Sequence, residues 1–260
     1  MATYWGIIPS AGCGSRIQPL AFSKELLPVG SLISQNIERP RAVSEYLIER
    51  MKIAGVTNIC MVISPAKSDI LKYYGNGTEG MHFCYTVQQN PSGLCDAIFC
   101  ALPLINRSDQ VIVGLPDTIW FPAESLLVLP DNQLSFLLFP VDKPHLYDAV
   151  ETDENNRVKY VHVKNMRIKE KWIWGAFKMP GSVLYDLHRL WCCEGRGDEY
   201  FGTLVNAYLD NGGTAFGYKT GSAYVDVGTI GGYRDAMQML VNSKQNNVAT
   251  QGFDGNKITY

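Results

Sequence analysis

The chain has 260 residues, of which 46% are hydrophobic and 18% are charged, and its formal net charge is −2. This length and composition suit one large α/β domain or two small ones. The near-neutral charge argues against nucleic acid or an anionic membrane as a partner, so any phosphate site must be a local concentration of cations.

The chain has no apolar run that approaches the ~20 residues of a membrane span, and its N-terminus lacks the basic-then-apolar pattern of a signal peptide. The seven cysteines form no Cys-x-x-Cys pair, which favours reduced thiols and a cytoplasmic location. The four histidines lack a His-Glu-x-x-His pattern, which disfavours zinc. We expect no nucleic acid polymer and no membrane as partners, and a homo-oligomer stays open.

A short apolar run at residues 5–9 predicts a buried strand, and a loop of small residues follows it. Gly12 and Gly14 permit backbone conformations that turn successive N–H groups toward one point. Such a nest suits a phosphate chain, and Arg16 and Lys24 add two positive charges beside it. The loop lacks the third glycine of the dinucleotide fingerprint and the Gly-Lys-Ser/Thr of the P-loop. Taken alone, it also fits a glycine-rich turn followed by two solvated cations.

Hydrophobic periodicity predicts alternating helices and strands through the first half of the chain. The predicted helices are 42–55, 67–74 and 94–105, and the further strands are 58–64, 83–87 and 110–114. This alternation indicates a mostly parallel sheet with helices on both faces. Ligands of such sheets bind at the carboxyl ends of the strands. The Gly12 loop, Gln88 and Asp117 each follow a predicted strand, so we expect them to converge.

The second half of the chain has less regular patterning. Strands are predicted at 134–141, 158–163, 173–179 and 215–219, and helices at 182–188, 203–210 and 230–244. The polar stretch 142–156 is expected to be a loop, and the residues after Asn246 a loose tail. Because no repeat, low-complexity tract or linker divides the chain, we predict a single domain over residues 1–260.

Further segments carry side chains suited to a nucleotide and a metal. Gln88 closes the third predicted strand, and its carboxamide can donate and accept hydrogen bonds, as the imide edge of uracil or thymine requires. Asp117 and Asp226 each end an apolar strand, and Mg²⁺ typically takes one or two protein carboxylates together with phosphates and waters. Each segment alone also fits a polar turn, a helix cap or a surface turn.

The motif of the first loop has a fixed order: Gly12-x-Gly14-x-Arg16, then Pro19, then Lys24-x-x-x-Pro28. This order resembles the signature of the sugar-1-phosphate nucleotidyltransferases, with the closest likeness to the glucose-1-phosphate thymidylyltransferase and uridylyltransferase group. The resemblance implies an α/β, Rossmann-like fold with a mixed, mostly parallel sheet flanked by helices, as in glycosyltransferase-A-like nucleotidyltransferases. It also implies a nucleotide-binding half at about 1–120 and a sugar-phosphate-binding half at about 121–245.

The resemblance further implies that the chain condenses a sugar-1-phosphate with dTTP or UTP, with Mg²⁺ as cofactor, and releases pyrophosphate. The implied residues are Ser10, Ala11, Gly12, Gly14, Ser15, Gln88 and Gly93 for the nucleotide, Arg16, Lys24 and Lys164 for catalysis, Tyr147, Asp148, Val163 and Gly175 for the sugar, and Asp117 and Asp226 for the metal. The nest and Arg16 would hold the β- and γ-phosphates. Lys24 would neutralise the α-phosphate, and Lys164 would bind the sugar phosphate.

Departures from the family pattern gather on the sugar side. Asp148 stands where the family has Gly, Val163 where it has Glu, and Asn165 where it has Pro. Because sites built to bond a hydroxyl strongly reject analogues that lack it, we expect a sugar other than ordinary glucose, or a remodelled pocket. The competing interpretation is a catalytically inactive nucleotide- or NDP-sugar-binding module. Retention of both carboxylates and both phosphate cations argues against that interpretation.

Overall fold

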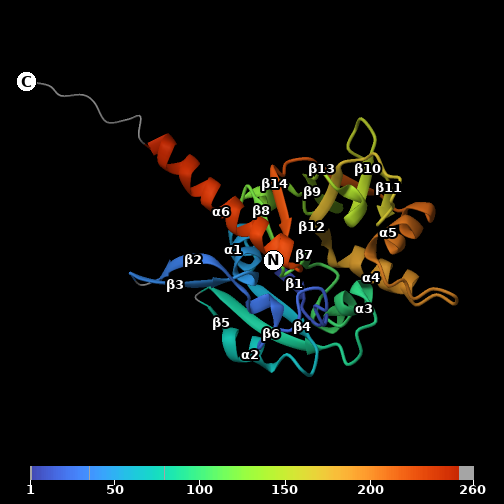
Figure 1. Ribbon diagram of the computed structural model, residues 1–260. Coiled ribbons are helices and arrows are strands. Elements are labelled where there is room, and N and C mark those ends of the chain that lie inside the picture. The colour runs from blue at the N-terminus through green and yellow to red at the C-terminus, as the bar shows by residue number, and fades with distance from the viewer. Residues whose placement is uncertain (1, 35, 79, 252–260) are drawn as a thin grey trace, which may run out of the picture.

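A mixed sheet of 10 strands forms the centre of the molecule (Figure 1). The structure is a computed structural model, and it describes residues 2–34, 36–78 and 80–251. The strands of this sheet are β1 (Tyr4–Pro9), β4 (Asn58–Ile63), β5 (Gly77–Thr78), β6 (Met81–Val87), β7 (Gln110–Gly114), β9 (Leu134–Pro140), β10 (Asp148–Thr152), β11 (Val158–Val163), β12 (Trp172–Pro180) and β13 (Ala215–Tyr218). Their order is β11-β10-β12-β7-β1-β4-β6-β5, with β9 pairing β12 and β13.

The strand directions confirm the mixed, mostly parallel sheet that the sequence predicts. The neighbours β7, β1, β4 and β6 run parallel, and β12 joins them antiparallel to β7. The register places Pro9 beside Val62 and Ile63 beside Val87. The chain segments that follow β1, β4 and β6 therefore leave the sheet at the same edge.

Helices cover both faces of the sheet. They are α1 (Ser44–Ile53), α2 (Ser68–Tyr74), α3 (Leu94–Phe99), α4 (Gly181–Trp191), α5 (Phe201–Asp210) and α6 (Ile230–Gln251). One buried cluster joins α1 and α2 to the sheet, and another joins α3, α4 and α5 to its opposite face, where Figure 1 shows these three helices together. None of the helices within residues 2–34, 36–78 and 80–251 is long and apolar enough to cross a membrane.

Two small sheets flank the main one. The first is a hairpin of β2 (Pro28–Ser34) and β3 (Ile37–Ala42), and the second pairs β8 (Thr118–Phe121) with β14 (Ala223–Asp226). The β8–β14 register sets Asp226 opposite Thr118. Asp226 is thereby brought beside Asp117, although the two carboxylates lie more than a hundred residues apart in the sequence.

Most predicted elements are confirmed within a few residues, but the stretch 142–156 is not simply a loop. It contains a short 3-10 turn, η4 (Pro144–Leu146), and strand β10. Only Ala149 and Val150 of β10 are buried, so its sequence lacks a long apolar pattern. The strand forms because β11 and β12 bracket it with antiparallel pairing.

The other differences lie at helix ends and in short elements. The helix predicted at 94–105 ends at Phe99, and a 3-10 turn, η2 (Leu102–Leu104), follows. Pro103 explains the break, since it has no N–H for the next helical hydrogen bond. At the other end of the chain α6 continues to Gln251, so residues 247–251 are helical rather than a loose tail, and residues 252–260 lie outside the described part of the chain. The hairpin β2–β3, strand β8, and the turns η1 (Lys24–Leu26) and η3 (Ser125–Val128) were not predicted.

Candidate active site

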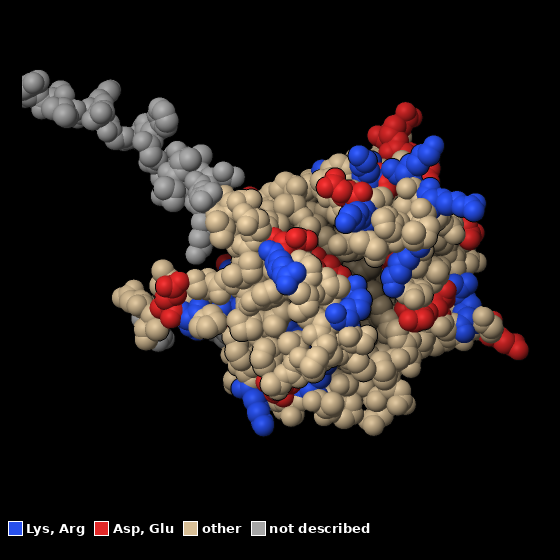
Figure 2. All heavy atoms as spheres, viewed as in Figure 1, with Lys and Arg blue, Asp and Glu red and all other residues tan. Residues whose placement is uncertain are grey.

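A cavity of about 410 Å³ opens where the carboxyl ends of the parallel strands meet. Among the residues that line it are Ala11, Gly12, Arg16, Lys24, Glu25, Gln88, Gly93, Leu115, Asp117, Lys164 and Asp226. The face seen in Figure 2 has basic side chains on both sides of a central hollow, with acidic side chains close by. The convergence expected from the strand order is therefore present, and it includes residues of both halves of the chain.

The loop after β1 offers unbonded backbone donors to this cavity. In the described part of the chain, none of the N–H groups from Ala11 to Arg16 donates a hydrogen bond. Gly14 has a φ of +65°, a backbone conformation that favours glycine. The φ of Gly12 lies outside this left-handed region. Ser10 is buried, and its N–H and hydroxyl both donate to backbone carbonyls. The free donors of the predicted nest therefore begin at Ala11.

Lys24 crosses this loop and pairs with Asp117. Its Nζ lies 2.6 Å from Asp117 Oδ2, and its aliphatic stem passes so close to Gly14 that a Cβ there would lie 2.7 Å from Lys24 Cδ. The neighbours of Lys24 are anchored as well, because Ser23 is hydrogen-bonded to Asp69 and Glu25 to Lys67. Burial alone would lower the pKa of Lys24, but the Asp117 carboxylate, together with Glu25 and Asp226, outweighs burial and raises it. Lys24 is thus a fixed, protonated cation.

The two predicted metal carboxylates both approach Gly228. A Cβ at Gly228 would lie 2.7 Å from Asp226 Oδ1 and 3.3 Å from Asp117 Oδ2. Burial alone would raise the pKa of Asp117, but the Lys24 ammonium, together with a backbone hydrogen bond and Arg16, outweighs burial and lowers it. Burial and then the Asp117 charge raise the pKa of Asp226, although Arg16 Nη2 lies 3.3 Å from Asp226 Oδ2.

This donor set suits a hard cation. Carboxylate oxygens are the ligands that Mg²⁺ takes, and it commonly uses one or two of them with phosphates and waters in the remaining positions. Among the described residues, no group of three or more His, Cys, Asp and Glu side chains is arranged to hold a metal. Asp117 and Asp226 therefore fit a metal that shares its coordination with a substrate better than a closed structural site.

On the opposite wall, Gln88 is held in one orientation. Its Nε2 donates to Gly93 O at 3.1 Å and to Asp96 Oδ2 at 2.6 Å. Both amide hydrogens are thereby engaged within the protein, which leaves Oε1 as the free hydrogen-bonding atom. Gly93 has a φ of +100°, and a Cβ there would lie 2.5–2.8 Å from atoms of Glu199. Only the acceptor of the donor–acceptor pair expected of Gln88 is therefore available to a ligand.

Lys164 enters the cavity from the other half of the chain. Its backbone has a φ of +43°, which is rare for a residue with a side chain and often marks a functional position. The Nζ atom lies 4.6 Å from the centre of the Tyr200 ring. The backbone N–H of Lys164 donates to Tyr147 O at 3.2 Å. Tyr147 in turn lines a neighbouring cavity of about 950 Å³, whose lining also includes Arg16 and Asp226.

The remaining predicted sugar residues, Asp148, Val163 and Gly175, are not among the residues that line these two cavities. Burial raises the pKa of Asp148, although Lys164 and the neighbouring Trp174 indole oppose the shift. No hydrogen bond of normal geometry reaches Asp148 Oδ1 within the described residues. Val163 packs toward α5, where a Cβ at Gly202 would lie 2.8 Å from it. Gly175 is covered by Phe139 and Tyr224.

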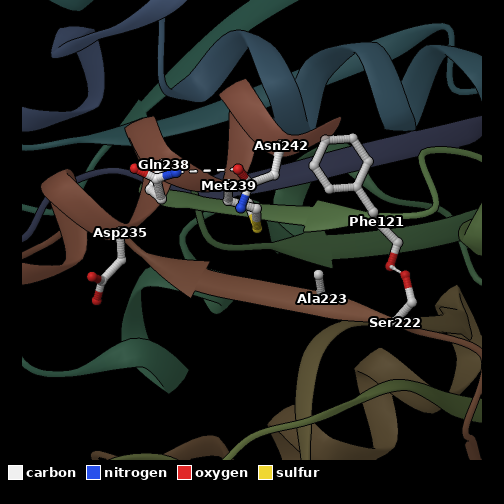
Figure 3. A pocket seen from close by; sticks show the side chains of 7 residues that line it. All are labelled: Phe121, Ser222, Ala223, Asp235, Gln238, Met239 and Asn242. Carbon is white, nitrogen blue, oxygen red and sulfur yellow. Dashed lines mark hydrogen bonds between the residues drawn. The ribbon is translucent and has the colours of Figure 1, made fainter. Parts of the chain in front are cut away.

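A third cavity, of about 490 Å³, lies between α6 and the β8–β14 pair (Figure 3). Its lining includes one charged side chain, Asp235, while the other side chains are neutral, such as Phe121, Met239 and the hydrogen-bonded pair of Gln238 and Asn242. Without a cation in its lining, this cavity does not suit a triphosphate. Of these two places, the cations lie at the sheet edge, where Arg16, Lys24 and Lys164 line the cavity.

The profile of the nucleotidyl transferase family matches residues 5–243. The chain belongs to this family. Relatives of this nucleotidyltransferase include the glucose-1-phosphate thymidylyltransferase of Neisseria meningitidis, which is 25% identical over 86% of the chain and 78% of the relative. The low-salt glycan biosynthesis nucleotidyltransferase Agl11 of Haloferax volcanii is 32% identical, over 59% of the chain and 42% of that relative.

Solved structures agree on the fold. A UTP-bound UGPase from Acinetobacter baumannii superposes with a TM-score of 0.73 at 17% identity, over 95% of the chain and 99% of that protein. The family match and the relatives confirm the resemblance stated from the first loop. The chain is an enzyme of the sugar-1-phosphate nucleotidyltransferase group, within NDP-sugar biosynthesis.

Several residues at the site were not predicted from the sequence. Glu25 lines the cavity, Asp96 orients Gln88, and Tyr200 underlies Lys164. Asp96 had a detectable signal, since it is an acidic residue three positions after Gly93, in the first turn of a predicted helix. Tyr200 had none, because its place beside Lys164 depends on how α5 packs against β11.

Proposed function

We propose that this nucleotidyltransferase condenses a sugar-1-phosphate with dTTP or UTP to give an NDP-sugar and pyrophosphate, with Mg²⁺ as cofactor. The observation that supports this most is the joint presence of Lys24, Asp117 and the free N–H donors of the Ala11–Arg16 loop in one cavity. A triphosphate needs such a concentration of donors and cations, and a metal that neutralises it needs carboxylates at the same place.

The nucleophile in this reaction is a phosphate oxygen, which is ionised at neutral pH, so the protein needs no general base. The difficulty is to bring two anions together and to stabilise charge at the α-phosphorus. The loop donors and Arg16 would hold the β- and γ-phosphates, and Lys24 would neutralise the α-phosphate. Lys164 would bind the sugar phosphate. Asp117 and Asp226 would hold Mg²⁺, which when bound supplies positive charge to the reacting phosphates.

The geometry of Gln88 supports recognition of uracil or thymine. Its free Oε1 can accept from the imide N–H that both bases present, and the Gly93 N–H, which is not hydrogen-bonded within the described residues, can donate to a base carbonyl. Cytosine presents an acceptor in place of the imide N–H, so an acceptor at Gln88 would select against it.

Replacing Gln88 with Ala should therefore relax base selection. We expect the kcat/KM ratio for UTP over CTP to fall about fivefold, because one hydrogen bond worth ~1 kcal/mol is removed for UTP alone. Steady-state kinetics with both nucleotides measures the ratio. Gln89→Ala is the matched control, since Gln89 is exposed. An unchanged ratio in Gln88→Ala would remove Gln88 from base recognition.

On the sugar side we propose that Asp148 remodels the pocket, so that the substrate is not ordinary glucose-1-phosphate. Asp148 carries a half-buried carboxylate with an unpartnered oxygen, next to the lysine that would bind the sugar phosphate. Replacing it with Gly should raise kcat/KM for glucose-1-phosphate about tenfold, since a competing carboxylate leaves the surroundings of Lys164. Glu154→Gly removes the same charge from an exposed turn and is the control. A lower kcat/KM for glucose-1-phosphate in Asp148→Gly than in wild type would refute the remodelling.

The decisive experiment for the reaction is to follow pyrophosphate release from the full chain with Mg²⁺, each nucleoside triphosphate and a panel of sugar-1-phosphates. Release with dTTP or UTP supports the proposal and identifies the sugar. Saturable dTTP or UTP binding without release from any pair would instead support a binding module. The division into two halves near residue 120, the cytoplasmic location and the oligomeric state stay predictions.

A further inference from the structure

The groups proposed for the metal and the groups proposed for the triphosphate are paired with one another in the structure. Lys24 Nζ lies 2.6 Å from Asp117 Oδ2, and Arg16 Nη2 lies 3.3 Å from Asp226 Oδ2. The other oxygen of Asp226 accepts the Gly228 N–H at 2.6 Å. Each carboxylate thus has a protein cation as its counter-ion, and a metal or a triphosphate that takes these groups must compete with these pairs.

We propose that Lys24 and Arg16 are exchangeable counter-ions, so that a divalent metal and a triphosphate bind to this chain with strong positive cooperativity. The inference rests on the proposed function, because it takes these carboxylates as the metal ligands and these cations as the phosphate ligands. It adds that each ligand, when it binds, frees the protein groups that bind the other ligand.

The charge balance explains the cooperativity. A metal that binds alone displaces the two cations and leaves them beside another positive charge. A triphosphate that binds alone draws the cations away and leaves two bare carboxylates beside a polyanion. When both bind, the metal neutralises the carboxylates and the cations neutralise the phosphates, so every charge keeps a partner. An uncompensated charge in a poorly solvated site is unfavourable, and the coupling must act equally in both directions.

Lys24 should contribute more of this coupling than Arg16. The side chains of Lys24 and Asp117 are 17% and 12% exposed, whereas Arg16 is 63% exposed. Solvent and salt weaken the exposed pair. The flanking residues Ser23 and Glu25 are tied to Asp69 and Lys67, so Lys24 can exchange partners by moving the end of its side chain alone.

This predicts an unusual result for a variant that loses a substrate-binding cation. Lys24→Met keeps the aliphatic stem over Gly14 but frees Asp117 from its counter-ion. In the absence of nucleotide, we expect it to bind Mn²⁺, used as the probe, about tenfold more tightly than wild type, which is within the range of ordinary coupling between sites. UTP should tighten Mn²⁺ binding in wild type and do so much less in Lys24→Met. Titration calorimetry of the full chain measures both affinities.

Lys164→Met is the matched control, because Lys164 lines the same cavity but is outside the ion pairs of both aspartates in the described residues. Equal tightening in both variants would show a general effect of net charge and would overturn the exchange. Mn²⁺ binding to Lys24→Met that is no tighter than in wild type would overturn it as well. Arg16→Met provides a second test if Lys24→Met does not fold, with a smaller gain expected.

The metal titration requires no turnover, so its outcome is independent of the proposed reaction. If Lys24→Met binds Mn²⁺ more tightly but the wild-type chain releases no pyrophosphate with any substrate pair, the counter-ion exchange is supported and the proposed function is refuted. If the wild type releases pyrophosphate but the variants bind Mn²⁺ as the wild type does, the proposed function is supported and the counter-ion exchange is refuted.

Discussion

Replacing Asp117 with Asn is expected to lower kcat by about 10²–10³-fold or more, the scale on which loss of one preorganised electrostatic group slows an enzyme. The substitution keeps the shape and the hydrogen-bonding oxygen but removes the charge that would hold the metal and that fixes Lys24 at 2.6 Å. Both groups proposed to neutralise the α-phosphate are then affected at once. Pyrophosphate release at saturating substrates measures kcat, and circular dichroism with thermal unfolding shows whether the fold is intact.

The control for this variant is Asp131→Asn. Asp131 also forms an ion pair with a lysine, Lys178, but it lies outside the candidate active site. The same chemical change should therefore leave kcat near the wild-type value there. If Asp117→Asn turned over as fast as wild type while folded, Asp117 would have no part in the reaction, and the proposed metal site would lose one of its two ligands.

The fold and the place of the site could be predicted because they depend on local patterns. Apolar runs such as residues 58–63 identify buried parallel strands without reference to the rest of the chain. Once those strands are parallel, their carboxyl ends must share an edge. The Gly12 loop, Gln88 and Asp117 then converge for the same reason, although more than a hundred residues separate Gly12 from Asp117.

The pairing of charges within the site could not be predicted in the same way. The Lys24–Asp117 contact spans 93 residues, and the Arg16–Asp226 contact spans 210. Their partners are set by the β8–β14 register, which brings Asp226 beside Asp117. Strand β8 was itself not predicted, since it is a run of four residues that follows the expected strand at Asp117 almost directly.

Side-chain direction is the second property that residue type does not reveal. Val163 and Asp148 were expected at the sugar because of their positions in the family pattern. In the structure Val163 packs toward Gly202 of α5, and Asp148 lies half-buried beside Lys164. Strand alternation predicts two faces, but only the packing of α5 decides which face is covered. Their roles in sugar recognition therefore stay predictions.

Gly228 should be as sensitive as the charged residues, for a purely geometric reason. A Cβ at this position would lie 2.7 Å from Asp226 Oδ1, 3.1 Å from Arg16 Nη2 and 3.3 Å from Asp117 Oδ2. Asp226 Oδ1 also accepts a hydrogen bond from the Gly228 N–H at 2.6 Å, so an added Cβ would displace the end of the carboxylate from this position. Gly228→Ala should lower kcat by up to about 10²-fold, because a misplacement of about 1 Å in the groups that position the reactants can cost that much.

The stability of Gly228→Ala should change little, since φ at Gly228 lies outside the left-handed region and alanine can adopt its backbone conformation. Gly231→Ala is the matched control three residues on, because the nearest atom to its added Cβ is Thr229 Oγ1 at 3.9 Å. We therefore expect kcat to fall in the first variant alone, with similar thermal unfolding of both. Wild-type turnover in Gly228→Ala would mean that the two carboxylates need not approach one point, which would argue against a shared metal even if each carboxylate were essential.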